Sequence, residues 1–199
     1  FPYLQYVQIL LAAILLVVGL ARLLGALKDR TTRVTLYEHG LEYLYRKNTI
    51  LLRWEDIARF TQHVTRHYYG FIPTGITHSF VINDTSGGMI VIDERIGRHK
   101  ELGEQIMLQM SNLKLPQYLS DIQAGKQIEF GKLVIDQDGI RCGNKNLPWN
   151  EVKDVQFKNG RVTIYKQGQA LGKWANLSGD EVPDAYMFSQ IAKQFIPQR

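Results

Sequence analysis

Cysteine and proline are scarce in this sequence. Its 199 residues include one cysteine, Cys142, and only 6 prolines. A single cysteine excludes an internal disulfide framework and a zinc site built from several cysteines. No residues that would activate a nucleophilic thiol surround it. We therefore expect Cys142 to be a small residue within a strand.

Glycine motifs that bind phosphate are also missing. Neither GxxxxGK[ST] nor GxGxxG occurs, and Gly87-Gly88 lies between two predicted strands, where a hairpin turn explains it. We expect no nucleotide, no other cofactor and no small-molecule substrate. With 45% hydrophobic and 22% charged residues, the composition is that of a folded chain.

Charge is absent from the first 21 residues, and Arg22 is the only charged residue between positions 4 and 27. As a helix this stretch would measure about 36 Å, enough for a hydrocarbon core of roughly 30 Å. We predict a transmembrane helix here. A cleaved signal peptide and a buried helix of a soluble protein fit less well, because the basic residues follow the apolar run and no polar face is present.

The basic residues after this run predict its orientation. Positive charge beside a span favours the cytoplasmic side, so we expect a single-pass membrane protein with cytoplasmic C-terminal domains. Lys28, Arg30 and Arg33 lie nearest the predicted bilayer and are candidate contacts for anionic lipids. Solvated surface charge is the alternative explanation for these three residues.

Small residues follow one stripe of the predicted span. Ala12, Gly19 and Ala26 recur every seven residues, and Ala21 with Gly25 forms a small-xxx-small pair. Small side chains let helices approach closely in lipid. These five residues are candidate helix-packing positions for an integral-membrane partner, although such residues are common in spans.

Alternation of apolar and polar residues begins after Arg33 and predicts antiparallel strands. The expected strands are 34–37, 41–45, 50–54, 57–69, 78–84 and 89–93, followed by a helix over 95–113 with Leu102, Ile106, Met110 and Leu113 on one face. A connector from 115 to 126 is expected to hold a short helix at 117–124.

The second half repeats this plan. The segments IEF, KLVID, IRC, KNLPW, VKDVQF, RVTIY and ALGKWANL predict seven strands, and residues 182–195 predict a closing helix. We therefore expect a transmembrane and juxtamembrane segment at 1–30, one module at 31–114, the connector, and a second module at 127–199.

Three matched positions in the two halves indicate a duplication. Gly40 corresponds to Gly139, Trp54 to Trp149 and Ile57 to Val152. In each copy the tryptophan should end a strand and the aliphatic residue should return the chain to the core. About seven strands capped by a helix resemble the pleckstrin-homology fold, so the expected class is α+β, mainly β, with two tandem modules.

Six short motifs occur in a fixed order along the chain: Leu36-Tyr37-Glu38-His39-Gly40-Leu41, Arg53-Trp54-Glu55-Asp56-Ile57, Val64-Thr65-Arg66-His67-Tyr68, Phe130-Gly131, Leu147-Pro148-Trp149 and Val182-Pro183. The order and spacing of these motifs resemble those of a bacterial family of unknown function. The resemblance covers nearly the whole chain. It implies membrane-anchored proteins with tandem pleckstrin-homology-like domains, and no activity or ligand.

Catalytic and metal-binding patterns are weak. His63 and His67 are four residues apart on one predicted strand, which separates them by about 13 Å and is too far for both to bind one metal ion. We therefore expect these two histidines and His78 to be packed in the fold or solvated. The acidic pairs fall at strand ends and helix starts, where capping explains them. We predict no catalytic residue, no metal and no nucleic-acid binding.

These observations favour a non-catalytic, membrane-anchored interaction protein. We expect an accessory or assembly subunit that docks on integral-membrane proteins through its span and its two β modules. The alternative hypothesis is a module that senses anionic membrane lipids. A third, an enzyme or metal protein, would require a convergent polar pocket.

Overall fold

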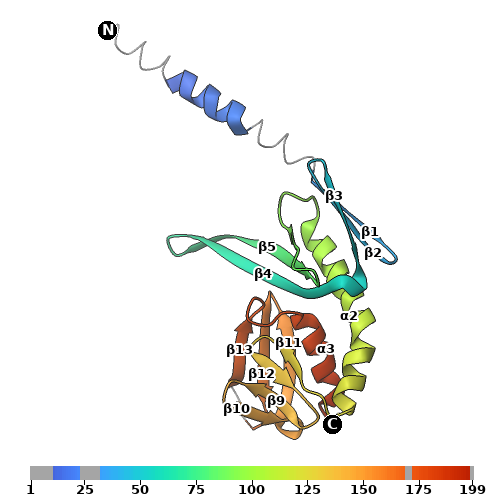
Figure 1. The fold of residues 1–199 in the computed structure, drawn as a ribbon. Coiled ribbons are helices and arrows are strands. Elements are labelled where there is room, and N and C mark those ends of the chain that lie inside the picture. Colours follow the sequence, from blue (N-terminus) through green and yellow to red (C-terminus); the bar gives the residue numbers. More distant parts are fainter. Residues whose placement is uncertain (1–10, 23–31, 169–171, 198–199) are drawn as a thin grey trace. The chain divides into compact units, whose positions relative to one another are not determined.

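The computed structural model describes residues 11–22, 32–168 and 172–197 of the chain (Figure 1). In these residues the protein is mainly β, with four small antiparallel sheets and three helices. Contacts between Cα atoms divide the chain into two units, residues 1–51 and residues 52–199. Each unit is described by itself below.

The helix of the first unit covers residues 11–22 where it is described, and all of its side chains are exposed. No helix among the described residues is long and apolar enough to cross a membrane. The transmembrane helix predicted over 4–27 is contradicted by this finding, and residues 4–10 and 23–27 lie outside the described part. The fold class that included it is wrong to that extent, and the single-pass topology with cytoplasmic domains is not supported.

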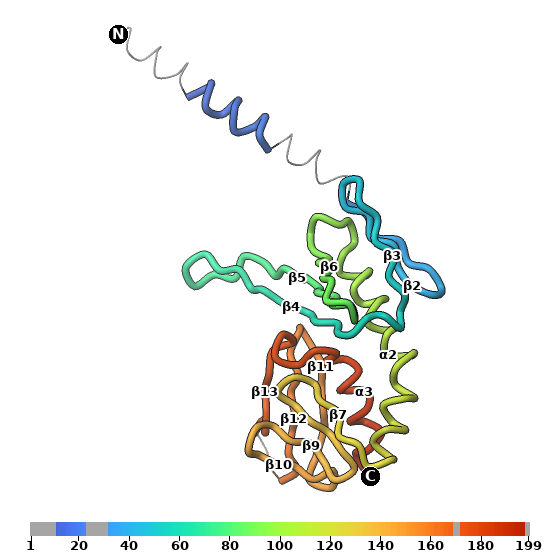
Figure 2. Tube along the Cα trace, viewed as in Figure 1, coloured from blue at the N-terminus to red at the C-terminus, as the bar shows by residue number. Residues whose placement is uncertain are grey.

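A three-stranded sheet in the order β1-β2-β3 follows in the first unit (Figure 2). Its strands are β1 (Arg33–Tyr37), β2 (Gly40–Tyr45) and β3 (Asn48–Arg53), the last of which ends in the second unit. Pairing of β1 with β2 runs from Arg33 with Leu44 to Tyr37 with Gly40. All three strands were predicted by alternation to within two residues.

The second unit opens with a sheet in the order β4-β5-β6. Its strands are β4 (Ile57–Tyr69), β5 (Ile72–Asp84) and β6 (Met89–Ile92). Alternation predicts β4 and β6 well, but β5 begins six residues earlier than the predicted 78. Pro73 and Gly75, interpreted from sequence as a turn, are part of this strand. The true turn is the short Gly70-Phe71 connection.

Helix α2 (His99–Gln123) is one continuous helix with Pro116 inside it. The sequence predicted two helices separated at this proline, because proline lacks the N–H that bonds to the preceding turn. Packing at both ends explains the continuity. Gly103 lies directly against the ring of Phe80 on β5, and Ile122 belongs to the apolar core of the second half. Of the predicted face, Ile106 and Met110 are buried, whereas Leu113 is 53% exposed.

Two sheets and a helix form the second half. One sheet has the order β10-β9-β8-β7 and the other β11-β12-β13, and both are antiparallel. The elements are β7 (Ile128–Phe130), β8 (Leu133–Ile135), β9 (Gly139–Cys142), β10 (Lys145–Pro148), β11 (Val152–Lys158), β12 (Arg161–Lys166), β13 (Lys173–Ser178) and α3 (Ala185–Phe195). The seven predicted strands are all present.

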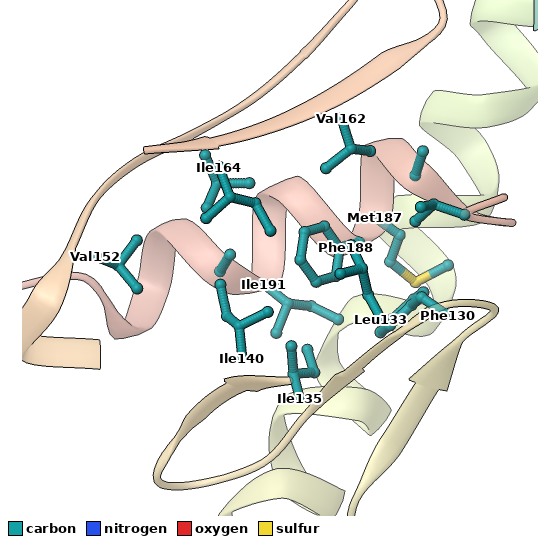
Figure 3. Packing of buried hydrophobic residues seen from close by; sticks show 14 of the residues in the cluster. Phe130, Leu133, Ile135, Ile140, Val152, Val162, Ile164, Met187, Phe188 and Ile191 are labelled. Carbon is teal, nitrogen blue, oxygen red and sulfur yellow. The ribbon is translucent and has the colours of Figure 1, made fainter. Parts of the chain in front are cut away.

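Helix α3 supplies the centre of the second half's core. Phe188 and Ile191 are fully buried and point between the sheets toward Leu133, Ile140 and Ile164 (Figure 3). Phe130 and Phe188 meet edge to face with ring centroids 5.5 Å apart. The predicted apolar face of this helix is confirmed for Phe188 and Ile191.

The duplicated tryptophans occupy matching positions. Trp54–Asp56 (η1) and Trp149–Glu151 (η2) are both single 3-10 turns between two strands, and both tryptophans are buried. The residue after each turn, Ile57 or Val152, is fully buried and donates its backbone N–H to the tryptophan carbonyl. The first copy has six strands in the described residues and the second has seven, so the expected count of about seven holds only for the second.

Candidate interaction surface: the β4–β5 ribbon and its base

The distal part of β4 and β5 is a two-stranded ribbon, residues 63–78. The two strands pair from Ile57 with Asp84 to Tyr69 with Ile72, whereas β6 covers β5 only from Phe80 to Asn83. The ribbon therefore extends beyond the third strand (Figure 1). An isolated hairpin is only marginally stable in water, so its length is not explained by the sheet alone.

The end of this ribbon is apolar and exposed. Residues 68–76 carry no charged side chain. The exposed fractions are 58% for Tyr68, 81% for Tyr69, 102% for Phe71, 66% for Ile72 and 55% for Ile76. Single exposed apolar residues are ordinary on protein surfaces, but a contiguous group of this kind marks an interaction site. We name these five residues the ribbon tip.

Apolar side chains occur on both faces of the ribbon tip. Tyr69 pairs with Ile72, and the neighbouring Tyr68 pairs with Pro73. Successive residues of a strand point to opposite faces, so each face receives one tyrosine. An irregularity in register between His67 and Tyr68 adds a local twist at this point. The ribbon tip therefore has apolar side chains on both faces.

The stem behind the ribbon tip contains no acidic residue. No aspartate or glutamate occurs between positions 57 and 83, while Arg59, Arg66 and three histidines do. His67 Nε2 lies 2.7 Å from Thr77 Oγ1, and His78 Nδ1 lies 3.4 Å from Gln62 Nε2. Burial, with Lys100 and His99 nearby, lowers the pKa of His78. Among the described residues no group of three His, Cys, Asp or Glu side chains could hold a metal ion.

Asp184 fixes the base of β4 to the second half. The Phe60 N–H donates to Asp184 Oδ1 at 3.2 Å, and the Asp184 N–H donates to the Phe60 carbonyl at 2.7 Å. Asp184 precedes α3 in the left-handed conformation, with φ of 53°. Burial raises the pKa of its carboxyl to about 6, while Lys114 and the Phe60 N–H act in the opposite direction. Lys114 donates to the Ile57 carbonyl, and burial lowers its own pKa.

Two glycines allow the second half to approach β4 further out. A Cβ on Gly179 would overlap the Gln62 carbonyl oxygen, and one on Gly160 would overlap the Val64 side chain. Gly160 also has φ of 67° in the Asn159-Gly160 turn, a conformation that favours glycine. The second half thus contacts β4 at three alternate positions, Phe60, Gln62 and Val64.

The base of β4 borders a small cavity and a wider groove. A cavity of about 10 Å³ between Phe60, Met110 and Asp184 has room for about one water molecule, far less than a cofactor needs. A wider groove of about 380 Å³ runs beside Arg66 and Tyr68, with Arg161 and Asp180 on its other wall. Arg161 is anchored by Asn176, to which it donates at 3.0 and 3.1 Å.

The residues singled out from the sequence as membrane contacts belong to the first unit or lie outside the described residues. Ala12, Gly19 and Ala21 are on the exposed helical segment 11–22, and Gly25, Ala26, Lys28 and Arg30 lie outside the described residues. Arg33 is exposed at the start of β1, where its Nε is 3.5 Å from Thr35 Oγ1. Their roles in helix packing and lipid contact stay predictions.

Sequence reasoning missed both the ribbon tip and Asp184. A run of nine uncharged residues that ends a long alternating strand was the available signal for the tip. For Asp184 the signal was a further repeat: Ile96-Gly97-Arg98 before α2 matches Val182-Pro183-Asp184 before α3. Arg98 and Asp184 adopt the same left-handed conformation, with φ of 57° and 53°.

Comparison with known proteins places the chain in a family. No curated protein and no solved structure matches it. A family of unknown function (DUF6585) matches residues 2–196, nearly the whole length, which includes both copies of the repeat and the ribbon within the first copy. The chain belongs to this family of unknown function.

Proposed function

We propose that this protein is a non-catalytic docking protein that engages its partner through the ribbon tip. The observation that carries the proposal is the exposure of Tyr69, Phe71 and Ile72 at the end of an uncharged run. Leaving such side chains in water costs roughly 1.5–3 kcal/mol each relative to burial. A partner that covers them would recover this free energy.

The arrangement at the base supports a docking role. Asp184, Gly179 and Gly160 hold one edge of β4 against the second half, whose core is filled by α3. A ribbon fixed at its base loses less conformational freedom on binding than a flexible loop would. In this proposal the second half is a support, and the ribbon is the part that reaches the partner.

The proposal retains two expectations from the sequence, one drawn from the family resemblance and one from the residues themselves. It treats each copy as a pleckstrin-homology-like module, in which sheets followed by a helix serve binding rather than catalysis, in a chain of bacterial origin. It also keeps the role of an accessory or assembly subunit within a larger complex. It assigns no catalytic step to any residue.

Native purification of the full chain tests the proposal. We would compare the wild type with Phe71→Gln/Ile72→Gln, which makes the ribbon tip polar without touching the base. The control is Leu108→Gln/Leu113→Gln on α2, which removes two partly exposed apolar side chains, 49% and 53% exposed, away from the ribbon. Loss of a stoichiometric companion protein, or of bound membrane lipid, from the tip variant alone is the expected result.

The outcome against the proposal is equally clear. A companion protein or bound lipid retained by the tip variant, or a wild-type chain that holds neither, would remove the ribbon from the function. Equal melting temperatures for the two double variants would show that neither result comes from unfolding.

A further inference from the structure

We infer that the partner of the ribbon tip is an anionic lipid surface, into whose interfacial layer the tip inserts. The inference rests on the proposed function and names the kind of partner. It concerns residues 63–78 alone and does not involve the helical segment near the N-terminus.

The shape of the ribbon tip favours a fluid apolar layer over a flat protein surface. A strand that docks on one surface needs one apolar face and keeps the other polar. Here Tyr68 and Tyr69 lie on opposite faces, and Phe71 in the turn after them is completely exposed. A ribbon with apolar side chains on both faces and in its turn can bury all of them at once when it enters an apolar layer.

The residue types of the ribbon tip fit the boundary between headgroups and acyl chains. Tyrosine has an apolar ring and a polar hydroxyl, and it concentrates at membrane–water interfaces. Phe71 and Ile72, at the far end, have no polar group and suit the deeper position. Amphipathic helices that bind this boundary bury their apolar face in it by about 5–10 Å, which sets the scale for the ribbon tip.

The charge behind the ribbon tip fits anionic headgroups. Arg66 lies four residues from the turn at Gly70, which is about 13 Å along an extended strand. Its long side chain can reach the headgroup level when the tip is inserted. The absence of acidic residues from 57 to 83 removes repulsion along the whole stem. Arg161 and Asp180 face the same groove at the base and cancel in formal charge.

Other binding partners would account for fewer features of the ribbon. A free phosphate would account for Arg66 and leave five exposed apolar side chains uncovered. A second copy of this ribbon would bring like charges together, because neither copy would supply an acidic residue. An acidic protein surface accounts for the charge, and the experiment below separates it from lipid.

A fluorophore at the ribbon tip tests the inference in the full chain. Phe71→Cys in a Cys142→Ser background would carry an environment-sensitive dye, and Met89→Cys in the same background is the matched control. Met89 is 64% exposed on β6, outside the ribbon. Because the signal is local, vesicle contact made by any other part of the chain does not imitate it.

Vesicles with about 30% phosphatidylserine should shift the emission of the dye at position 71 to the blue, and pure phosphatidylcholine should shift it far less. The shift should shrink as salt rises from about 0.1 M to about 1 M. Arg66→Gln should lower the apparent affinity about fivefold. The dye at position 89 should not respond to either vesicle.

A dye at position 71 that stays in water, responds equally to both vesicles, or responds no more than position 89 would overturn the inference. If that happens while the tip variant still loses its companion protein, the docking function stands and the partner is a protein. If the tip variant loses nothing and the dye is silent, both proposals fail.

Discussion

The two copies of the repeat build the same hairpin to different lengths. After the buried tryptophan turn, β11 has 7 residues and β12 has 6, whereas β4 and β5 have 13 each. The short hairpin ends where the core ends, because Val162 and Ile164 already cover α3. The long one continues past its third strand with apolar residues that are exposed in the part of the chain that the structure describes. The proposed docking role would explain this extra length.

Matched truncations of isoleucine should show the largest contrast between the hairpins. Ile164 on β12 is fully buried, and Ile76 on β5 is 55% exposed. Ile164→Ala should lower the free energy of unfolding by about 2–5 kcal/mol, because it leaves a cavity. Ile76→Ala should change it by less than about 0.5 kcal/mol. Urea titration followed by fluorescence measures both, and equal losses would mean that the ribbon is packed.

Glycine substitutions test whether the second half supports the long hairpin. Gly179→Ala places a methyl group on the Gln62 carbonyl and should lower the free energy of unfolding by about 1–3 kcal/mol. Gly75→Ala, within the ribbon, has open space around its Cβ and should change stability by less than about 1 kcal/mol. Thermal melts of the two variants compare them directly. A Gly179→Ala protein as stable as wild type would contradict the close approach.

Asp184 gives the base of β4 a pH dependence. Its folded-state pKa of about 6 lies above the usual 3.8, so its favourable contribution is complete below about pH 4 and is lost as the pH rises through 6. Asp184→Asn keeps an acceptor for Phe60 but cannot ionise. Relative to this variant, wild type should lose about 1–3 kcal/mol between pH 4 and pH 7. Parallel curves for the two proteins would show that Asp184 is not buried as described.

Much of this fold follows from local pattern. Alternation located twelve of the strands closely, since each buries one face, and the tryptophan repeat located the two matching turns. Longer-range packing decided the rest. Pro116 stays helical because both ends of α2 are packed, and Pro73 stays in β5 because β4 pairs with it. Continuous apolarity near the N-terminus predicted a span that the described helix does not support.

The candidate surface was harder to predict than the fold. Apolar residues on a strand are normally evidence of a core, so the sequence alone did not distinguish Phe71, fully exposed, from Phe80, fully buried. The distinction depends on where β6 stops pairing with β5. The role of Asp184 likewise depends on its hydrogen bond with Phe60, which lies 124 positions away in the sequence.

Helix α2 has a consequence for cooperativity. Its first turns pack on β5 through Gly103, and its last turns are part of the core around Phe130. Both copies of the repeat therefore pack against this helix. A protein cut within it would leave each fragment without part of the helix that covers its core. The duplication that produced two similar modules has ended in one folding unit from β4 onward, which should melt in a single step.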